Sequence, residues 1–359
     1  MKKKLLALIL TATLAAGMMT GCLSSSATPP AASAPQAQQS AADPAPAADS
    51  GTEKTVIKIS FAGGDAHPIM KTLEEFKKMF EERTEGRYDV QLYANAVLGD
   101  DLKATEQVKA GMLDAVVTST SPVGTIVKEL MVFDLPYLFK SEEEADQILS
   151  GSFAQYLDDK MAEKGLVNVA WYEDGFRHLT NSKQTVTSPA DVKGMKIRTM
   201  ENPIHLAAWK ALGANPTPMA YTDVFTALQQ HVIDGQENPF PTIYDGKFYE
   251  VQKYMSTTGH VYSPFIFVYS SQLFEKLPAE DQAIFKEVAK ATEPINREIN
   301  RADAQSCREK MEAAGMEVTD LTMEQKQVFQ DLLTPIWGDF TDVFGEEALA
   351  KLQEELAKL

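Results

Sequence analysis

Hydrophobic positions recur along this chain with two spacings, period two and helical, and together they predict an α/β protein. Residues 56–61 alternate hydrophobic and polar side chains and are rich in β-branched residues, which is typical of a strand. Apolar residues then recur at helical spacing over residues 73–80 within a charged segment. The same patterns predict a strand, a helix and a strand over residues 88–93, 101–110 and 115–118. This βαβαβ order favours a mostly parallel sheet with helices on both faces.

The middle of the chain contains a further strand followed by a strand–loop–helix unit. An apolar strand predicted over residues 166–171 precedes residues 175–177, where we place the first crossover between two domains. A β-branched run that ends in Arg198 is followed by Asn202 and Pro203. Asparagine is a favoured N-cap and proline is favoured in the first helical turn, so a helix is predicted to begin here. Because ligands bind at the carboxyl ends of strands in open α/β sheets, we expect a site near Arg198.

The last third of the chain is predicted to return to the first domain and then to form a long helix. Residues 260–268 form an apolar strand that carries the chain back. Residues 279–314 follow a helical pattern that only Pro294 interrupts, which is long for one globular helix. Two further helices, predicted over residues 323–333 and 346–356, complete the second domain. The chain is long enough for two α/β domains.

The N-terminus is typical of an export signal. Three lysines precede an apolar run, residues 5–16, that is too short for a permanent transmembrane helix. Residues 19–22 place small residues before Cys22, as in a bacterial lipobox. We therefore predict a signal peptide over residues 1–21 and a lipidated, disordered tether over residues 22–53, which are mostly Ser, Ala, Pro, Gln and Asp. The tether would hold the folded domain at a membrane outside the cytoplasm. The alternative is an ordinary signal peptide with an incidental cysteine.

Composition excludes several classes of function. The chain carries 34 Lys and Arg against 51 Asp and Glu, a net charge of −17, which argues against a nucleic-acid partner. An anionic ligand must then be held by a local basic site against an unfavourable overall field. If Cys22 carries a lipid, Cys307 is the remaining cysteine and is predicted to be a free thiol. We find no Cys/His spacing for zinc and no P-loop, dinucleotide or hydrolase motif, so we expect no metal, no cofactor and no enzymatic activity.

Two arginines and an amide are the candidates for ligand binding. The guanidinium of Arg198 can match a carboxylate with two parallel hydrogen bonds, and its alternative role is a surface or domain-stabilising salt bridge. Arg177 lies at the predicted crossover, where it would contact the ligand or pair with Glu173 or Asp174. The amide of Asn238 would donate to a carboxylate or form a turn before the following proline. These residues describe a carboxylate receptor more readily than a catalyst.

Polar residues on loops that should face the same cleft are candidates for reading hydroxyl groups or an amine. They are Asp65, His67, Glu106, residues 119–121 and Glu201. Of these, His67 more readily stabilises its own loop, whereas Glu201 and Asp65 favour a hydroxylated ligand such as a sugar acid. An extracytoplasmic enzyme and a ligand-sensing receptor with a two-lobed cleft stay open as alternatives.

The order of several short motifs resembles the DctP-type solute-binding subunits of tripartite ATP-independent periplasmic (TRAP) transporters. The motifs are Gly-Phe-Arg (175–177), Lys-Gly-Met-Lys-Ile-Arg (193–198), Glu-Asn-Pro (201–203), Ala-Leu-Gly-Ala-Asn-Pro-Thr-Pro-Met (211–219), Asp-Val-Phe-Thr-Ala-Leu-Gln (223–229) and Asp-Gly-Gln-Glu-Asn-Pro (234–239). Each string alone is weak, but their order and spacing are specific. The resemblance extends over nearly the whole chain after the tether.

This resemblance implies a periplasmic-binding-protein fold with two α/β lobes, each a mostly parallel sheet flanked by helices. Lobe I would comprise residues 54–175 and 264–303, and lobe II residues 176–263 and 304–359. The long predicted helix would bridge the lobes, and the ligand would bind between them.

The resemblance also implies roles for single residues and for partners. Arg198 would clamp the ligand carboxylate, Arg177 would stand at the cleft wall, and Asn238 would contact the ligand. Tyr221 would cover the apolar part of the ligand, with core packing as its alternative role, and His67 lies in the usual family place. The protein would be a monomer that delivers a small organic acid, such as a sugar acid or a C4-dicarboxylate, to TRAP permease subunits for ion-gradient-driven uptake.

Overall fold

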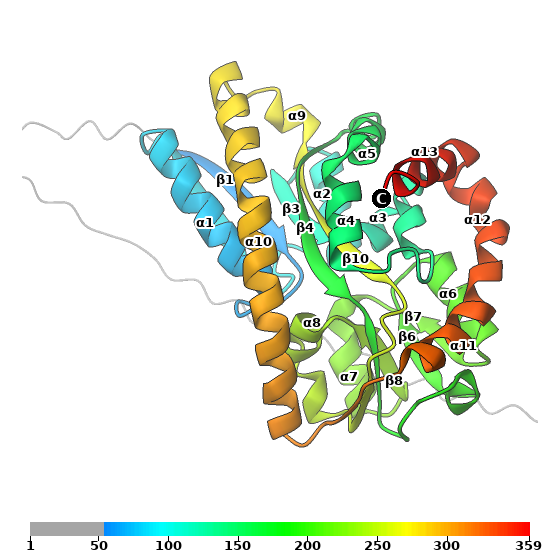
Figure 1. Ribbon diagram of the computed structural model, residues 1–359. Helices are drawn as coiled ribbons and strands as arrows, with labels where there is room; N and C mark the ends of the chain where they lie inside the picture. Colours follow the sequence, from blue (N-terminus) through cyan, green and yellow to red (C-terminus); the bar gives the residue numbers. More distant parts are fainter. Residues whose placement is uncertain (1–53) are drawn as a thin grey trace, which may run out of the picture. The chain divides into compact units, whose positions relative to one another are not determined.

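Two separate β-sheets form the centre of the fold (Figure 1). The computed structural model describes residues 54–359, so the predicted signal peptide, Cys22 and the tether lie outside the described residues. Within the described part of the chain, no helix combines the length and the apolar character that crossing a bilayer requires.

The first sheet has the strand order β2-β1-β3-β10-β4. Its strands are β1 (Thr55–Phe61), β2 (Tyr88–Tyr93), β3 (Ala115–Ser119), β4 (Leu166–Phe176) and β10 (Tyr262–Ser270). β1 pairs in parallel with β2 and β3, as the βαβαβ pattern predicts. β10 runs antiparallel to β3 and β4.

The second sheet has the order β11-β9-β5-β8-β6-β7. Its strands are β5 (His178–Asn181), β6 (Lys196–Thr199), β7 (Asn215–Pro218), β8 (Gly235–Asn238), β9 (Tyr254–Ser256) and β11 (Glu317–Thr319). β6 is parallel to β7 and β8, whereas β5 is antiparallel to β8 and β9. The predicted α/β fold with mostly parallel sheets is confirmed: a single strand in each sheet, β10 in the first and β5 in the second, runs antiparallel to the others.

Helices flank both sheets. The α-helices are α1 (Pro68–Arg83), α2 (Asp101–Lys109), α3 (Thr120–Val123), α4 (Glu142–Ser150), α5 (Ser152–Ala162), α6 (Pro203–Ala211), α7 (Val224–Gln229), α8 (Phe240–Asp245), α9 (Ser271–Phe274), α10 (Ala279–Ala313), α11 (Met323–Leu333), α12 (Trp337–Phe344) and α13 (Glu346–Leu356). Short 3₁₀ turns are η1 (Lys128–Asp134), η2 (Pro189–Val192), η3 (Tyr221–Asp223), η4 (Phe248–Glu250) and η5 (Thr334–Ile336).

The chain passes between the two sheets at two places. It leaves β4 of the first sheet at Phe176 and enters β5 of the second at His178, and it returns between β9 and β10. The first passage leaves Arg177 as the single residue between the two strands, and its side chain is 1% exposed. A charged side chain is therefore fixed at the junction of the two sheets.

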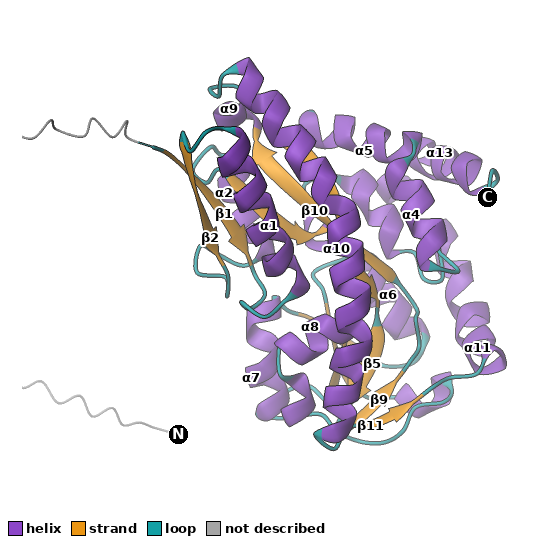
Figure 2. Cartoon of the chain, turned by 60° about the vertical axis from the view of Figure 1, so that its left-hand side comes forward, coloured by secondary structure: helices purple, strands orange, loops and turns teal. Residues whose placement is uncertain are grey.

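One helix, α10, runs alongside both sheets (Figure 2). Its polar side chains cover the edge strand β4: Glu293 accepts a hydrogen bond from the backbone N–H of Trp171 at 3.0 Å, and Asn296 accepts one from that of Glu173 at 2.7 Å. An edge strand has N–H groups that no neighbouring strand can satisfy, and α10 supplies the acceptors. The helix continues through Pro294, where the pattern predicted an interruption, because these bonds hold it to β4 on either side of the proline.

The C-terminal helix packs with helices that accompany the first sheet. Ala348 and Leu352 of α13 belong to the same apolar cluster as Ile148 of α4 and Phe153 of α5. We predicted that α13 would complete the second domain. Its buried apolar stripe instead lies against α4 and α5, so this helix is grouped with the first sheet. The exact division of the chain into two lobes stays a prediction.

Gly235 of β8 allows β5 and β8 to approach closely. A Cβ added at this position would lie 2.3 Å from the backbone oxygen of Thr180 on β5. Because that neighbour is backbone rather than a flexible side chain, Gly235→Ala should force the two strands apart. We expect the free energy of unfolding, measured by urea denaturation, to fall by about 1–3 kcal/mol or more.

Gly338→Ala is the matched control, since no atom lies within 4 Å of a Cβ added there, near the start of α12. Alanine favours a helix over glycine, so this variant should be as stable as the parent or slightly more stable. Parental stability of the Gly235→Ala variant would contradict the close approach of β5 and β8.

Candidate functional site

Strand ends from both sheets meet at one cavity. Phe61 and Ser119 end β1 and β3 of the first sheet, while Arg198 and Asn238 lie at the carboxyl ends of β6 and β8 of the second. The free volume between the lining atoms is about 580 Å³, part of it open to solvent. Because ligands of open α/β sheets bind at this edge of the strands, this cavity is the candidate site.

Arg198 is a buried cation in this cavity. It is 3% exposed, and its Nε and Nη2 donate to the backbone oxygen of Met219 at 2.9 and 2.6 Å. Among residues 54–359, no acidic side chain forms an ion pair with it and none accepts a hydrogen bond from its Nη1. Burial, assisted by the nearby charge of Arg177, lowers the pKa of Arg198 to about 10, so the side chain remains charged at neutral pH. A buried charge without a counter-ion is costly, which indicates an anionic ligand.

The hydrogen bonds of Arg198 change the expected geometry of its contact with a carboxylate. Its Nε–Nη2 side is occupied by the carbonyl of Met219. A ligand can therefore use Nη1 and the second proton of Nη2, at the end of the guanidinium. The residue also lies within β6 and is buried, so it contributes to packing as well.

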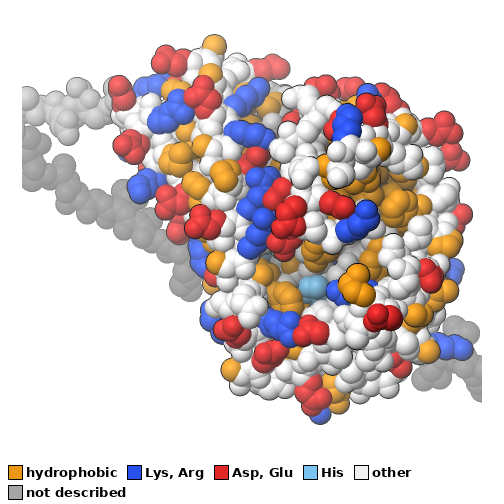
Figure 3. Space-filling view, viewed as in Figure 1, with side chains coloured by type: hydrophobic (Ala, Val, Ile, Leu, Met, Phe, Trp, Pro, Cys, Tyr) orange, Lys and Arg blue, Asp and Glu red, His pale blue; other side chains and the backbone are white. Residues whose placement is uncertain are grey.

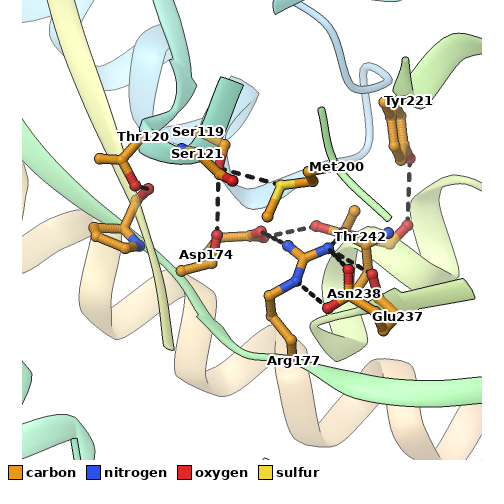
Figure 4. A network of polar contacts seen from close by, with 12 residues as sticks. Ser119, Thr120, Ser121, Asp174, Arg177, Met200, Tyr221, Glu237, Asn238 and Thr242 are labelled. Carbon is orange, nitrogen blue, oxygen red and sulfur yellow. Dashed lines mark hydrogen bonds and ion pairs between the residues drawn. The ribbon is translucent and has the colours of Figure 1, made fainter. Parts of the chain in front are cut away.

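Arg177 is paired across the second sheet. Its Nε donates to Glu237 Oε2 at 2.6 Å, and its Nη2 donates to Glu237 Oε1 at 3.0 Å and to Asn238 Oδ1 at 2.7 Å. We predicted ligand contact or a pair with Glu173 or Asp174. The closer ion pair is made with Glu237, because β5 and β8 are antiparallel neighbours and bring the two residues together, while Asp174 Oδ2 lies at 3.9 Å from Arg177 Nη1 as a longer, predicted pair. Ligand contact by Arg177 stays a prediction. Figure 4 shows the guanidinium between Asp174 on one side and Glu237 and Asn238 on the other.

Glu237 is the functional neighbour that sequence reasoning missed. It is fully buried, and His260 Nε2 lies 3.0 Å from its Oε2. Burial acts to raise the pKa of this carboxyl, but the Arg177 guanidinium and the bond with His260 hold it well below its usual range. The ionised carboxylate fixes two of the three nitrogens of Arg177, and Nη1 is left on the side of the cavity. The sequence analysis identified the motif that contains Glu237, residues 234–239, but did not predict that Glu237 pairs with Arg177.

Asn238 and Tyr221 both line the cavity, as predicted. The Nδ2 of Asn238 donates to Gln236 Oε1 at 2.6 Å, while its oxygen accepts from Arg177. The hydroxyl of Tyr221 donates to the backbone oxygen of Thr242 at 3.3 Å, which turns the ring toward the cavity wall. These contacts do not test ligand binding, so the roles of Asn238 and Tyr221 in binding a ligand stay predictions.

The polar loop residues divide into two groups. His67 and Glu201 line the cavity, and His67 also caps α1 by accepting a hydrogen bond from the backbone of Ile69 at 3.2 Å. Burial lowers the pKa of His67 to about 3, so it is neutral near pH 7. Asp65 and Glu106 are exposed and do not line the cavity, contrary to our expectation, because Asp65 points to Asn95 on the outer side of its loop and Glu106 lies on an exposed face of α2.

Three carboxyl groups in the cavity wall, those of Asp100, Asp101 and Asp174, were not among the predicted ligand residues, and Asp100 is paired with Lys103 at 2.9 Å. Asp174 of β4 is 2% exposed, and its Oδ1 accepts a hydrogen bond from Thr242 Oγ1 at 2.6 Å. Burial raises its pKa to about 7, although the Arg177 charge and the Thr242 bond act in the opposite direction. Asp101, the first residue of α2, accepts from Thr118 Oγ1 at 2.8 Å, and burial raises its pKa to about 6. Asp174 had been considered only as a partner for Arg177.

Contacts between segments of the two sheets surround the cavity. Asn202 caps α6, as predicted, by accepting from the N–H of Ile204, and its Nδ2 donates to Asp134 Oδ2 at 2.7 Å. The backbone N–H of Gly64 donates to Asp245 Oδ2 at 2.7 Å. These bonds join a loop after β1 to α8, and α6 to η1, so the two halves of the site are held together.

A second cavity opens on the side of α10, where acidic and basic side chains are interspersed (Figure 3). His178 lies in its wall. The guanidiniums that line it are already paired with acids, Arg301 with Glu173 at 2.7 Å and Arg308 with Asp320 at 2.7 Å. The first cavity therefore remains the candidate site.

The described residues show neither a metal site nor an ionised thiol. In this part of the chain, no three His, Cys, Asp or Glu side chains gather in a way that would hold a metal ion. Cys307 is a buried free thiol, and burial raises its pKa to about 11, so it is protonated at neutral pH.

Known proteins resemble this chain over most of its length. The model of the family "bacterial extracellular solute-binding protein, family 7" (DctP) matches residues 59–342. A solute-binding protein of Verminephrobacter eiseniae is 42% identical over 301 residues, which is 84% of this chain and 89% of that protein.

Two solved structures share the fold and carry bound acids. One is a TRAP periplasmic solute-binding protein of a Polaromonas species, bound to D-erythronate, with a TM-score of 0.80 and 37% identity. The match covers 84% of this chain and 98% of that one. A sugar-acid-binding protein of Advenella mimigardefordensis, in complex with galactonate, has a TM-score of 0.83 and 31% identity, with 85% of this chain and 99% of that one covered.

Asp174 should make the fold less stable at neutral pH. Its pKa of about 7 in the folded state exceeds the value near 3.9 of an unfolded chain. The folded protein thus binds this proton more tightly, and stability is lost as pH rises from about 4 to about 7. Asp174→Asn keeps an oxygen for the Thr242 bond and removes the titration. We expect the variant to exceed the parent in free energy of unfolding at about pH 8, by a margin that shrinks toward about pH 4.

Asp339→Asn, an exposed position on α12, is the control and should follow the parent at every pH. Urea denaturation across this pH range provides the measurement. A variant at Asp174 that is less stable than the parent at about pH 8 would show that the carboxylate supports the fold.

Proposed function

This chain belongs to family 7 of the bacterial extracellular solute-binding proteins, the DctP family, and on that premise we propose that it captures a small organic carboxylate for a TRAP transporter. The observation that carries the proposal is Arg198, a buried guanidinium with no acidic partner among residues 54–359. A carboxylate bound beside it would supply the missing counter-ion. Proteins of this family act as extracytoplasmic receptors, and TRAP receptors work with membrane permease subunits.

The carboxylate would lie between the Nη1 groups of Arg177 and Arg198. Arg177 is pre-oriented by Glu237, so little side-chain freedom is lost when a ligand binds. Charge-assisted hydrogen bonds are the strong ones, and both donors belong to buried side chains. Asn238 would complete the polar wall, and Tyr221 would cover the apolar part of the ligand.

Ligand binding would also favour the closed arrangement of the two halves of the site. Arg198 and Tyr221 come with the second sheet, whereas Ser119 and Asp101 come with the first. A ligand that contacts both groups has a higher affinity for the closed form, and by that difference it shifts the population toward closure. The closed form would then dock on the permease subunits, and the ion gradient would supply the energy.

The ligands of two relatives support a carboxylate as the bound group. The Polaromonas protein was solved with D-erythronate and the Advenella protein with galactonate, and both compounds are hydroxylated acids. For this chain the proposal covers sugar acids and C4-dicarboxylates. We further propose that the protein is a monomer without catalytic turnover, anchored by a lipid on Cys22 at the outer face of a membrane.

Arg198 should dominate affinity. Arg198→Ala leaves the ligand carboxylate unpaired in a buried site, so we expect binding to weaken by about 2–5 kcal/mol, roughly thirtyfold to several thousandfold. Arg198→Lys should recover only part of this loss, because an ammonium cannot occupy the same planar geometry. Calorimetry with the tightest ligand from an organic-acid library provides the measurement.

Arg83→Ala is the matched control, since Arg83 pairs with Glu287 on the surface and should leave binding unchanged. Thermal unfolding of each variant checks that lost affinity is not lost folding, because Arg198 also bonds Met219. Binding by Arg198→Ala within about threefold of the parent, less than about 0.7 kcal/mol, would remove the basis of the proposal.

The anchor on Cys22 has its own test. Cys22→Ser should abolish lipidation and move the protein from the membrane fraction to the soluble extracytoplasmic fraction, because no other hydrophobic anchor is proposed. Fractionation followed by immunoblotting measures this, with Cys307→Ser as the matched cysteine control that should stay with the membrane. Unchanged membrane association of Cys22→Ser would refute the lipobox prediction.

A further inference from the structure

The ligand cavity contains carboxyl groups, which is unexpected for a site that takes an anion. Asp174 and Asp101 both line it, together with Arg177 and Arg198, with Glu201 and with Asp100, which pairs with Lys103 at 2.9 Å. Asp174 is buried and Asp101 is partly buried, and each adds negative charge where a carboxylate is proposed to bind. Neither acid forms the main ion pair of an arginine, because Arg177 is paired with Glu237 and Arg198 bonds Met219. The presence of the two acids therefore needs a reason other than the ion pairs.

Each of the two acids has one oxygen in use and one free. Asp174 Oδ1 accepts from Thr242, while Oδ2 lies 3.9 Å from Arg177 Nη1, too far for a hydrogen bond. Asp101 Oδ1 accepts from Thr118. Within residues 54–359, no group donates a hydrogen bond to the Oδ2 of either residue. When the two carboxyl groups are ionised, both free oxygens are acceptors in the cavity, so they require donors from a ligand or from water.

The chemistry of these acceptors limits what the far part of the ligand can be. A second carboxylate carries no proton at about pH 8, so it cannot donate, and at that pH Asp174 and Asp101 are both ionised and would be two like charges beside it. An ammonium can donate, but within reach of Asp174 or Asp101 it would also lie near the guanidinium of Arg177 or Arg198. A neutral hydroxyl donates without either repulsion.

We propose that Asp174 and Asp101 determine specificity by accepting hydrogen bonds from ligand hydroxyl groups, so that the site selects hydroxylated monocarboxylates over dicarboxylates. This inference rests on the proposed carboxylate site and narrows its ligand class. The hydroxyl of Ser119 lies in the same wall, with long contacts to Ser263 at 3.4 Å, to Met200 Sδ at 3.7 Å and from the backbone N–H of Ser121 at 3.5 Å, and it can serve as a further partner (Figure 4).

Matched pairs of acids with equal chain length test the proposal by calorimetry on the full mature chain at about pH 8, above the pKa of both acids. The pairs are erythronate with succinate and galactonate with adipate, and 4-aminobutyrate is the ammonium probe. We expect the hydroxylated acid of at least one pair to bind about a hundredfold or more tightly than its dicarboxylate, because a site built for hydroxyl donors rejects a partner that lacks them. 4-Aminobutyrate should bind no better than the dicarboxylates.

Asp174→Asn and Asp101→Asn test whether these two residues determine the preference between the two kinds of acid. The Thr242 or Thr118 hydroxyl keeps the amide oxygen in place, so the NH₂ group takes the position of the free acceptor. Affinity for the hydroxylated acid should fall about tenfold or more, while affinity for the dicarboxylate should rise, so the ratio between them shrinks. A merely structural effect would weaken both ligands together. Asp65→Asn is the control, because it removes the same charge from a residue outside the cavity.

Several outcomes would overturn the inference. Equal binding of both members of each pair would do so while leaving the carboxylate site intact, provided that Arg198→Lys still weakens both. If Asp174→Asn and Asp101→Asn change the affinity for both members of a pair equally, the two residues act only through their charge and do not determine specificity. Tightest binding of 4-aminobutyrate would assign them to an ammonium group. If no acid binds and Arg198→Lys changes nothing in a wider screen, the proposed function fails together with the inference.

Discussion

The ion pair between Arg177 and Glu237 is the interaction on which the rest of the site depends. Both side chains are fully buried or nearly so, and the carboxylate occupies two of the three guanidinium nitrogens. A buried pair of this kind is weak evidence for stability, since its desolvation cost is comparable to its attraction. Its structural effect is clearer: the guanidinium is held in one orientation, and its remaining nitrogen lies on the side of the cavity. Removal of Glu237 would leave this buried charge with only the longer pair to Asp174, at 3.9 Å, among the ion pairs of the described residues.

The fold places this pair where both sheets can use it. β4 delivers Asp174 and Arg177 to the junction, and α10 holds the edge of β4 through Glu293 and Asn296. β8 delivers Glu237 and Asn238 from the second sheet. The same junction then faces the carboxyl ends of β1 and β3, so a ligand bound there contacts elements of both sheets. The proposed link between binding and closure rests on this geometry, because the residues proposed to contact the ligand come from elements of both sheets.

The sequence predicted the elements well because they depend on local pattern. The first three strands, the cap at Asn202 and the long helix after Ala279 follow from spacing, β-branching and capping chemistry. Pairings between distant residues were not predictable in this way. Arg177 was assigned acids three or four residues away at most, but its partner lies 60 residues on, and only the register of β5 and β8 reveals it. Asp101 was overlooked for the same reason, and Asp65 was overestimated because its loop turns it outward.

The most direct test of this account is a crystal structure of the protein with the hydroxylated monocarboxylate that it binds most tightly. The account predicts the ligand carboxylate within hydrogen-bond distance of Nη1 of both Arg177 and Arg198, with the Arg177–Glu237 pair unchanged and ligand hydroxyls on the free oxygens of Asp174 and Asp101. A ligand whose carboxylate is held away from both arginines, or a complex in which Arg177 leaves Glu237 to bind it, would contradict the account.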